Sequence, residues 1–403
     1  MSDRNHASSI PVPVERLGDG AIAVERFSGV VGVLGLLVCV AAFFWSRVEF
    51  FQSYLFAVLY WGGFSLGGLG VLLMHNTVGG RWGVTIRRLL EAEMRTLPLL
   101  ALLLVPIFLF ALRLLYPWAR PEEVALTPVL QHKQGYLNVP FFVARAVIYF
   151  IVWMFWGLRV SRMADQQDET GDPTLRERMR AFSAPGVLVF VLTASFAYID
   201  WLLSTDAQFF STIYGAMLLI GDVLQTFALS IIVLVLVSGK DGFQGRINSK
   251  VLHDLGNLMF AFVIFWTYLS ASQLIIVWPA NLPQELQWYL DRVHGSWKYI
   301  TVTIALVMFA IPFLLLLSQA RKRNPVRLMR VAIFILVARA IDLFWIIEPQ
   351  FRKNGFTWSW TDLPVFLGVG GIWVYVFMRQ LRRRPLLPLQ DERIAPPVLE
   401  AVR

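Results

Sequence analysis

Ionisable side chains inside long apolar runs are the residues of this sequence that could carry out chemistry. Asp222 lies well inside one run, Asp200 lies near the end of another, and Arg339 and Asp342 lie one helical turn apart in a third. A charged side chain at membrane depth costs at least about 2.5 kcal/mol, so it usually faces other helices and marks a relay or an ion path. We therefore predict a proton path that includes these four residues.

Each of these residues also has a structural interpretation. Arg339 and Asp342 would share one face of a helix, where they form either a fixed ion pair or a step of the relay. No basic residue lies within a turn of Asp222, which favours a relay or a quinone-facing role, with Arg339 of another helix as candidate partner. Arg145 lies near the end of its run, and we expect its guanidinium to reach the membrane surface.

Further polar residues could extend the path toward one face of the membrane. His253 and Asp254 stand at the start of an apolar run and His75 at the end of another, where they could cap helices or admit protons. We expect a set of polar side chains to lead inward from Asp222 through water, with no carboxylate in that interval: Thr226, Ser230, Asn257, Thr267, Ser270 and Gln273.

The cysteine and histidine inventory argues against a redox centre or metal site in this chain. Cys39 is the single cysteine, which excludes an internal disulfide, a four-thiolate iron–sulfur cluster and covalent haem attachment. All five histidines fall in expected tails, loops or span ends, so a haem held between two facing helices is not expected. We predict no covalently bound cofactor and no metal.

The composition predicts an all-α integral membrane protein. Hydrophobic residues make up 57% of the chain, charged residues only 16%, and the mean hydropathy is +0.60. The basic residues lie between apolar runs rather than on one face, which argues against nucleic acid. The runs are too long and uniformly apolar for barrel strands. They predict ten transmembrane helices, at 27–45, 54–75, 97–115, 140–158, 185–203, 211–238, 254–278, 298–319, 326–348 and 363–380.

Charge placement predicts the topology. Most of the 36 Lys and Arg lie in the two tails and in every second connection, so the positive-inside rule places both termini in the cytoplasm. We expect tails at 1–26, flexible, and at 381–403, around a membrane domain at 27–380. No small-residue cleavage site follows the first run, which we expect to be a retained span.

A short internal repeat suggests how the helices are grouped. The pattern Ile-Asp, then an acid, then Gln-Phe occurs twice with the same spacing, at Asp200 and at Asp342. Both copies would point outward, so we expect two parallel-repeat four-helix bundles, helices two to five within 54–203 and six to nine within 211–348, plus two peripheral helices. Glycines of the second helix would allow close packing: Gly62, Gly63, Gly67, Gly68 and Gly70.

Several stretches together resemble one protein family over about residues 27 to 380. They are MHNTVGGRWG (Met74–Gly83), RTLPLLALLLVPIF (Arg95–Phe108), YLNVPFFVARAVIYF (Tyr136–Phe150), and the segments Ser195–Asp222 and His253–Glu285. This combination resembles the smaller polysulfide-reductase-type membrane subunit of alternative complex III, a bacterial quinol:electron-acceptor oxidoreductase of respiratory or photosynthetic electron transfer. The resemblance implies a two-bundle subunit of the inner membrane.

The resemblance also implies partners. A larger paralogous membrane subunit would bind quinol, while haem cytochrome subunits and an iron–sulfur subunit would carry the electrons. This chain would have no redox centre of its own and would contribute to proton translocation, with contact to quinone or lipid left open. The alternatives are a self-sufficient secondary transporter and a purely structural membrane anchor.

Overall fold

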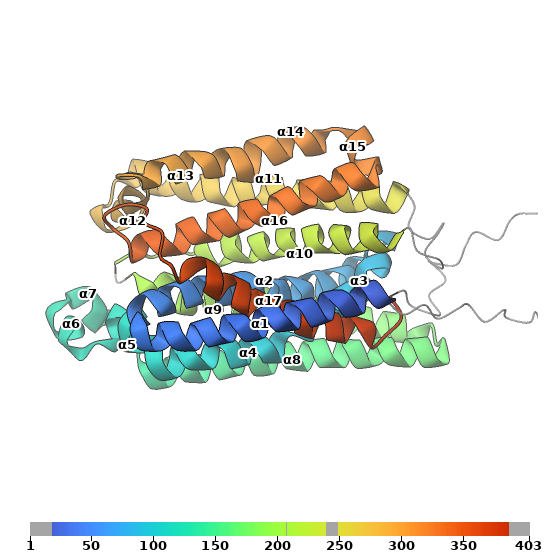
Figure 1. The fold of residues 1–403 in the computed structure, drawn as a ribbon, viewed down its shortest axis with the longest axis horizontal. Coiled ribbons are helices and arrows are strands. Elements are labelled where there is room, and N and C mark those ends of the chain that lie inside the picture. Colours follow the sequence, from blue (N-terminus) through green and yellow to red (C-terminus); the bar gives the residue numbers. More distant parts are fainter. Residues whose placement is uncertain (1–17, 207, 239–248, 387–403) are drawn as a thin grey trace, which may run out of the picture.

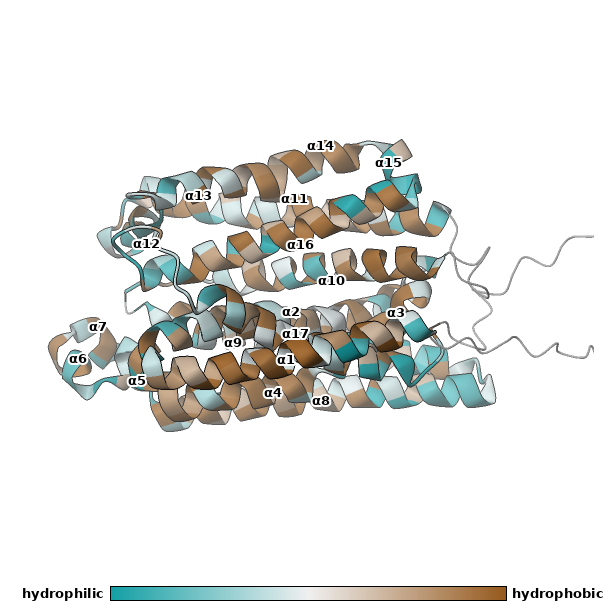
Figure 2. Cartoon of the chain, viewed as in Figure 1, coloured by the Kyte–Doolittle hydropathy of each residue, from teal (hydrophilic) through white to brown (hydrophobic). Residues whose placement is uncertain are grey.

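The chain folds into a bundle of long helices, in a computed structural model that describes residues 18–206, 208–238 and 249–386. No strand occurs among these residues, and nine helices there are long and apolar enough to cross a membrane. The helices run alongside one another (Figure 1), their middles are mostly hydrophobic, and hydrophilic residues gather toward their ends (Figure 2). The prediction of an all-α membrane protein is therefore confirmed.

Eight long helices form the body of the bundle. They are α1 (Asp19–Trp45), α2 (Arg47–Val78), α8 (Val139–Thr170), α9 (Thr174–Trp201), α10 (Tyr214–Ser238), α11 (Ser249–Ala280), α16 (Pro325–Ile347) and α17 (Asp362–Arg382). All but α16 belong to the nine apolar helices. Helix α16 lies beside α10 and corresponds to the expected span 326–348. It is not among the nine because its charged residues, including Arg339 and Asp342, interrupt the apolar run.

Two further apolar segments are built from shorter pieces. One consists of α3 (Arg81–Met94), α4 (Leu97–Pro106), the π-helical η1 (Ile107–Ala111) and α5 (Leu112–Leu115). The other consists of α13 (Trp297–Ile304), the π-helical η4 (Ala305–Ala310) and α14 (Ile311–Leu317). Short π-helical segments widen a helix locally and are frequent at functional sites.

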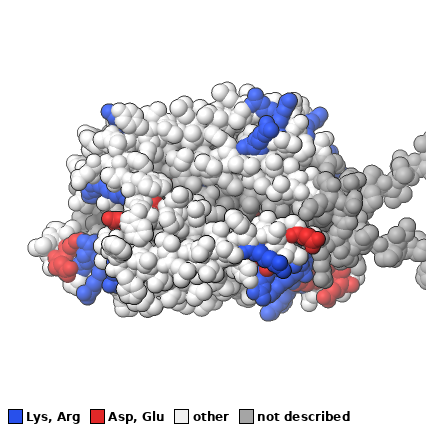
Figure 3. Space-filling view, in the orientation of Figure 1, with Lys and Arg blue, Asp and Glu red and all other residues white. Residues whose placement is uncertain are grey.

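Short helices lie at the two ends of the bundle. At one end, left in Figure 1 and called the α12 end below, are η2 (Pro117–Ala119), α6 (Pro121–Leu126), α7 (Pro128–Lys133), η3 (Leu203–Thr205), α12 (Pro283–Val293) and η5 (Glu348–Gln350). The opposite end, called the α15 end, holds α15 (Gln319–Arg323). In the space-filling view, Lys, Arg, Asp and Glu gather toward both ends (Figure 3), as expected if the middle lies in lipid.

Several helices extend beyond the predicted spans. Helix α1 begins at Asp19, inside the expected tail, and α11 begins at Ser249, before His253. The third span was expected at 97–115, and the helical structure that leads into it starts at Arg81 and packs along the second half of α2. A break at Arg95 and Thr96 separates α3 from α4, where Pro98 occupies the first turn. Most of both expected tails lies outside the described residues.

The packing places α2 and α10 at the centre. Helix α2 contacts α3, α9, α10 and α17, while α10 contacts α2, α9, α11 and α16. The expected peripheral helices α1 and α17 pack against each other, and a Cβ atom on Gly35 would collide with the Gly368 backbone. Residues carried by α2, α9, α10 and α16 can therefore meet in one buried place.

Candidate proton-transfer site

Asp222 is a buried carboxylate where four helices meet. It projects from α10, and it is about 1% exposed. The hydroxyl of Tyr198, from α9, donates a hydrogen bond to its Oδ2 atom. On the other side, Nη2 of Arg339 from α16 lies 3.5 Å from its Oδ1 atom. The group thus has a neutral donor and a cation as partners.

Arg339 bridges two carboxylates. Its Nη1 atom lies 2.5 Å from Oδ2 of Asp342, and its Nη2 atom also donates to the Leu218 carbonyl at 3.2 Å. Gly221 makes room for the guanidinium, because a Cβ atom there would lie 2.6 Å from Nη2. The predicted Arg339–Asp342 pair and the proposed contact of Arg339 with Asp222 are both present. Asp342 is itself fully buried.

Glycines of α2 bring its backbone against the acid. A Cβ atom on Gly63 would lie 2.6 Å from Oδ1 of Asp222. A Cβ atom on Gly67 would collide with the Asp222 backbone oxygen and the Thr226 hydroxyl. These two glycines, predicted only to allow close packing, therefore leave space for the polar groups of α10 in particular.

Glu93 is a second buried acid at this place, and sequence reasoning missed it. It lies on α3, is fully buried, and has its Oε2 atom 2.9 Å from where a Cβ on Gly68 would be. Thr226 is close enough to interact with it, yet no hydrogen bond of ordinary geometry joins them. The prediction that no carboxylate fills the interval beyond Asp222 is thus wrong. Every residue from Gly83 to Met94 is buried, so no helical periodicity in the sequence marks Glu93.

The expected polar interval is only partly assembled. Thr226 and Ser230 are fully buried on α10, one turn apart on the side of Glu93. Asn257 instead accepts a hydrogen bond from Nζ of Lys322 at 2.5 Å near the α15 end. The remaining three predicted members, Thr267, Ser270 and Gln273, line a cavity at the α12 end.

Asp200 belongs to a separate ion pair in which every carboxylate oxygen is engaged. Arg145 of α8 donates to both of its oxygens at 2.8 Å, and the Tyr149 hydroxyl donates at 2.9 Å. The expectation that Arg145 reaches the membrane surface is wrong, since it is buried and stacked on the Tyr136 ring at 3.7 Å. Asp200 faces α8, whereas Tyr198, two residues earlier, faces α10.

His253 and Asp254 lie apart from the Asp222 group. Their side chains, 3.9 Å apart at closest approach, are partly exposed near the start of α11. Asn257, one turn later, contacts His253 at 3.3 Å. His75 lies in the last turn of α2, as expected, and is buried against the ring of Trp82.

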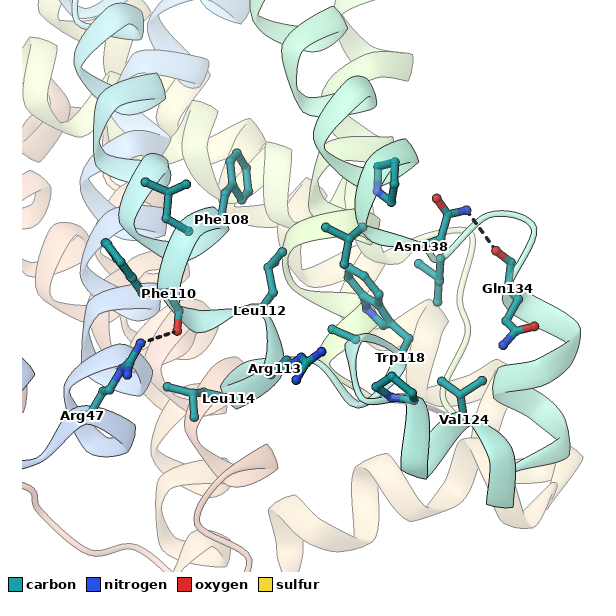
Figure 4. A pocket seen from close by; sticks show the side chains of 16 residues that line it. Arg47, Phe108, Phe110, Leu112, Arg113, Leu114, Trp118, Val124, Gln134 and Asn138 are labelled. Atoms are coloured by element: carbon teal, nitrogen blue, oxygen red, sulfur yellow. Dashed lines mark hydrogen bonds between the residues drawn. The ribbon is translucent and has the colours of Figure 1, made fainter.

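The two larger hollows at the α12 end of the molecule are the following. The first, of about 950 Å³, is bordered by η1, η2 and the start of α8, and its wall includes Arg113 (Figure 4). There Arg47 donates to the Phe110 carbonyl at 3.2 Å. The second, of about 670 Å³, lies among α10, α11, α12, η4 and α16 and reaches Asp342. A π-helical segment borders each hollow.

Arg292 fixes the short helix α12 beside the second hollow. Its guanidinium lies 3.4 Å from the centre of the Trp288 ring and donates to the Ile346 carbonyl of α16 at 2.5 Å. Burial lowers the pKa of Arg292 from its usual value to about 10, which keeps the side chain charged near neutral pH. The aromatic residues of α12 are thereby held against α16.

Neither a metal cluster among the described residues nor a match to a family model identifies the site. Within the described residues, no group of three or more His, Cys, Asp or Glu side chains is arranged to hold a metal ion. The expected lack of cofactors stays a prediction. In comparisons with known proteins, no protein-family model matches the chain, and none of the curated proteins matches it.

Proposed function

We propose that this chain transfers protons within the membrane and so couples an electron-transfer reaction to proton movement. The proposal depends on a row of buried side chains from three helices that lie next to one another: Asp342, Arg339, Asp222, Thr226 and Glu93. A purely structural ion pair needs one acid for one base, but here two acids share Arg339. Glu93 has no cation among its described partners, which favours a group that changes its protonation state.

The glycines of α2 support the same proposal. A side chain at Gly63 or Gly67 would occupy the space in which Asp222 and Thr226 lie, so the contact between α2 and α10 depends on their absence. We propose that protons pass between Asp222 and Glu93 along this contact. Asp342 extends the path toward the α12 end. Asp200, which is fully paired with Arg145, would serve as a structural group rather than a carrier.

We further propose that the α15 end faces the cytoplasm and the α12 end faces outward. The excess of Lys and Arg in the connections at the α15 end supports this orientation. The two helix groups around α2 and α10, with α1 and α17 beside α2, fit the expected pair of parallel four-helix bundles. Asp222 would then lie where the bundles meet, and His253 and Asp254 would lie near the cytoplasmic entrance.

The motifs from Met74 to Glu285 favour one setting for this activity. We propose that the chain is the smaller membrane subunit of an alternative complex III in a bacterial inner membrane. Its partners would be a larger paralogous quinol-binding subunit, haem cytochrome subunits and an iron–sulfur subunit. Electrons would pass through those subunits, while this chain would contribute the proton path.

The proposal is tested by Asp222→Asn in the assembled complex, reconstituted in sealed vesicles. We expect electron flow from quinol to acceptor to be largely kept and the number of protons moved per electron to fall. Asp19→Asn, an equivalent change at an exposed acid in the first turn of α1, is the matched control. An unchanged ratio in assembled Asp222→Asn complex would falsify the role of Asp222.

A secondary transporter is the second candidate, because an apolar cavity next to a buried acid would also suit a transported substrate. Purification of the chain from its native membrane separates the two functions. Haem cytochromes that copurify in fixed stoichiometry support the complex. A stable single protein that takes up a substrate in vesicles supports the transporter.

A further inference from the structure

Another hollow lies at the α15 end of the molecule, where α2 ends and α9 begins. It is called the arginine cavity below, and its volume of about 400 Å³ is within the range of small-molecule sites. Polar and charged side chains form most of its wall: His75, Asn76, Thr77, Arg87, Arg176, Glu177 and Arg180. The two hollows at the α12 end, in contrast, are lined mainly by apolar residues. The arginine cavity therefore suits a polar ligand.

A tight turn brings two walls of this cavity together. Helix α2 ends at Val78, and Gly79 and Gly80 follow with φ angles of 82° and 107°. This region of backbone conformation favours glycine, which has no Cβ atom. The turn sends α3 back along α2, so Arg87 of α3 and the last turn of α2 line the same cavity.

The wall carries more positive than negative charge. Three arginines and one glutamate line it. Arg87 is buried and already pairs with Glu91, with Nε and Oε1 3.3 Å apart. Arg176 and Arg180 lie one helical turn apart on α9 and are exposed. Neither of these two side chains forms a hydrogen bond or an ion pair with another described residue, so both remain available to an anion.

The donors of the cavity favour a phosphate group. A guanidinium presents two parallel N–H donors that match two oxygens of a phosphate. The side-chain nitrogen of Asn76 is a further donor, because it is buried and has no acceptor among the described residues. Glu177, the one carboxylate of the wall, is exposed and can turn toward water.

The N-terminus of α9 adds little to this preference. Its first amide, that of Thr174, already donates to Oδ1 of Asp172 at 2.9 Å. A helix terminus whose amide is capped by a carboxylate attracts a second anion only weakly. The preference for an anion therefore comes from the arginine side chains.

We propose that the arginine cavity binds a phosphate group, held by Arg176, Arg180 and the Asn76 amide. A dissolved phosphate compound and an anionic phospholipid head group share this chemistry, and both occur where the end of a membrane bundle meets water. The proposal does not depend on the proton-transfer function. Because Arg87 pairs with Glu91, a bound phosphate would adjoin α3, the helix that also carries Glu93.

A dissolved phosphate is tested with the full chain in dodecyl maltoside micelles, which contain no phosphate. Inorganic phosphate and pyrophosphate are titrated by calorimetry at an ionic strength held constant with sodium chloride. A double variant with Arg176→Gln and Arg180→Gln should weaken saturable binding at least about tenfold, because it removes two charge-assisted contacts. Arg178→Gln, exposed on the same helix and outside the cavity wall, is the matched control and should keep the wild-type affinity.

A lipid source is tested in the same micelles with added dioleoylphosphatidylglycerol. Native mass spectrometry counts the lipid molecules that stay bound. If the phosphate belongs to a head group, wild type and Arg178→Gln should retain one more lipid than the double variant does. Binding in the calorimetric test, without this difference in lipid, identifies a dissolved phosphate compound.

The variants are suited to a decisive result. Arg176 and Arg180 are exposed and pair with no described residue, so we expect the double variant to keep the helical circular dichroism of wild type. Arg180→Gln alone repeats both tests if the double variant does not fold. The proposal is overturned if neither probe binds, if wild type and the double variant bind both probes equally, or if Arg178→Gln loses as much binding as the double variant.

Discussion

Tyr198 of α9 donates its hydroxyl hydrogen to Asp222 of α10. Helix α9 packs against α2, α8 and α10, while α10 also packs against α11 and α16, so this bond links the neighbours of both helices. A shift of α9 can therefore alter the environment of an acid on α10. This is the simplest physical route by which the proposed proton path could respond to events elsewhere in a complex.

Tyr198→Phe should weaken that connection without emptying the space. Loss of a buried hydrogen bond to a carboxylate costs about 1.5–3 kcal/mol, and we expect a corresponding fall in the free energy of unfolding. Denaturation of the purified chain in mixed micelles measures it. Tyr299→Phe, at an exposed tyrosine of α13, should leave stability nearly unchanged. Equal losses for the two variants would contradict a specific bond at Tyr198.

Arg339→Ala should be the most damaging single change in the Asp222 group. It would leave Asp222 and Asp342 buried without their shared cation, and breaking a buried ion pair typically costs about 3–5 kcal/mol. We expect poor folding, measured as the yield of monodisperse protein. Restored yield in the triple variant with Asp222→Asn and Asp342→Asn would show that uncompensated charge is the cause. Arg330→Ala, exposed on the same helix, is the control.

Gly67→Ala tests the close contact of α2 with α10. The added methyl group would collide with the Asp222 backbone and the Thr226 hydroxyl, so one of the helices must shift. We expect a loss of about 1–3 kcal/mol in the free energy of unfolding, as for other overpacked sites. Gly20→Ala in α1, where a Cβ atom meets nothing within 4 Å, should be neutral or slightly stabilising. A Gly67→Ala protein as stable as wild type would argue against the tight contact.

Asp200→Asn separates a structural acid from a proton carrier. The change weakens the two hydrogen bonds from Arg145 and leaves that guanidinium buried without a counter-charge, which should cost about 3–5 kcal/mol of stability. In complex that does assemble, the number of protons moved per electron should equal that of wild type. A lowered ratio in the assembled variant would place Asp200 on the path after all.

The sequence predicted the long helices and the contacts of Arg339 with Asp342 and with Asp222. Long apolar runs identify crossings whatever their neighbours, and helical periodicity places Arg339 beside Asp342. The sequence does not determine which side of a helix faces which neighbouring helix. Arg145 was therefore assigned to the membrane surface, although its partner Asp200 lies on the next long helix. Contacts of this kind depend on helix rotation, which no local pattern records.

Helix α3 was not predicted, for a different reason. Arg81, Arg87, Arg88 and Arg95 are typical of a connection between spans, yet the structure places a helix there in which Arg87 and Arg88 are buried and pair with Glu91. Paired charges remain inside a helical bundle at a lower cost than single ones, so counting charge alone underestimates how far a helix extends. Because the stretch with Glu93 was interpreted as a connection, Glu93 was not recognised as a buried acid.

Glu93→Gln tests the part of the path that sequence alone did not reveal. The amide nearly matches the carboxyl group in shape, and Glu93 has no described cation to lose, so we expect the variant to fold and to assemble. Glu91→Gln, two residues away, would instead weaken ion pairs with Arg87 and Arg88 and should destabilise the protein by about 1–3 kcal/mol. The two variants should therefore differ in opposite ways. Glu93→Gln should lower the number of protons moved per electron and keep wild-type stability, whereas Glu91→Gln should lower stability and keep the wild-type ratio.

Both variants are measured in the same vesicles and with the same denaturation assay. A Glu93→Gln complex with a wild-type ratio would remove Glu93 from the path and leave Asp222 without a carrier on the α15 side.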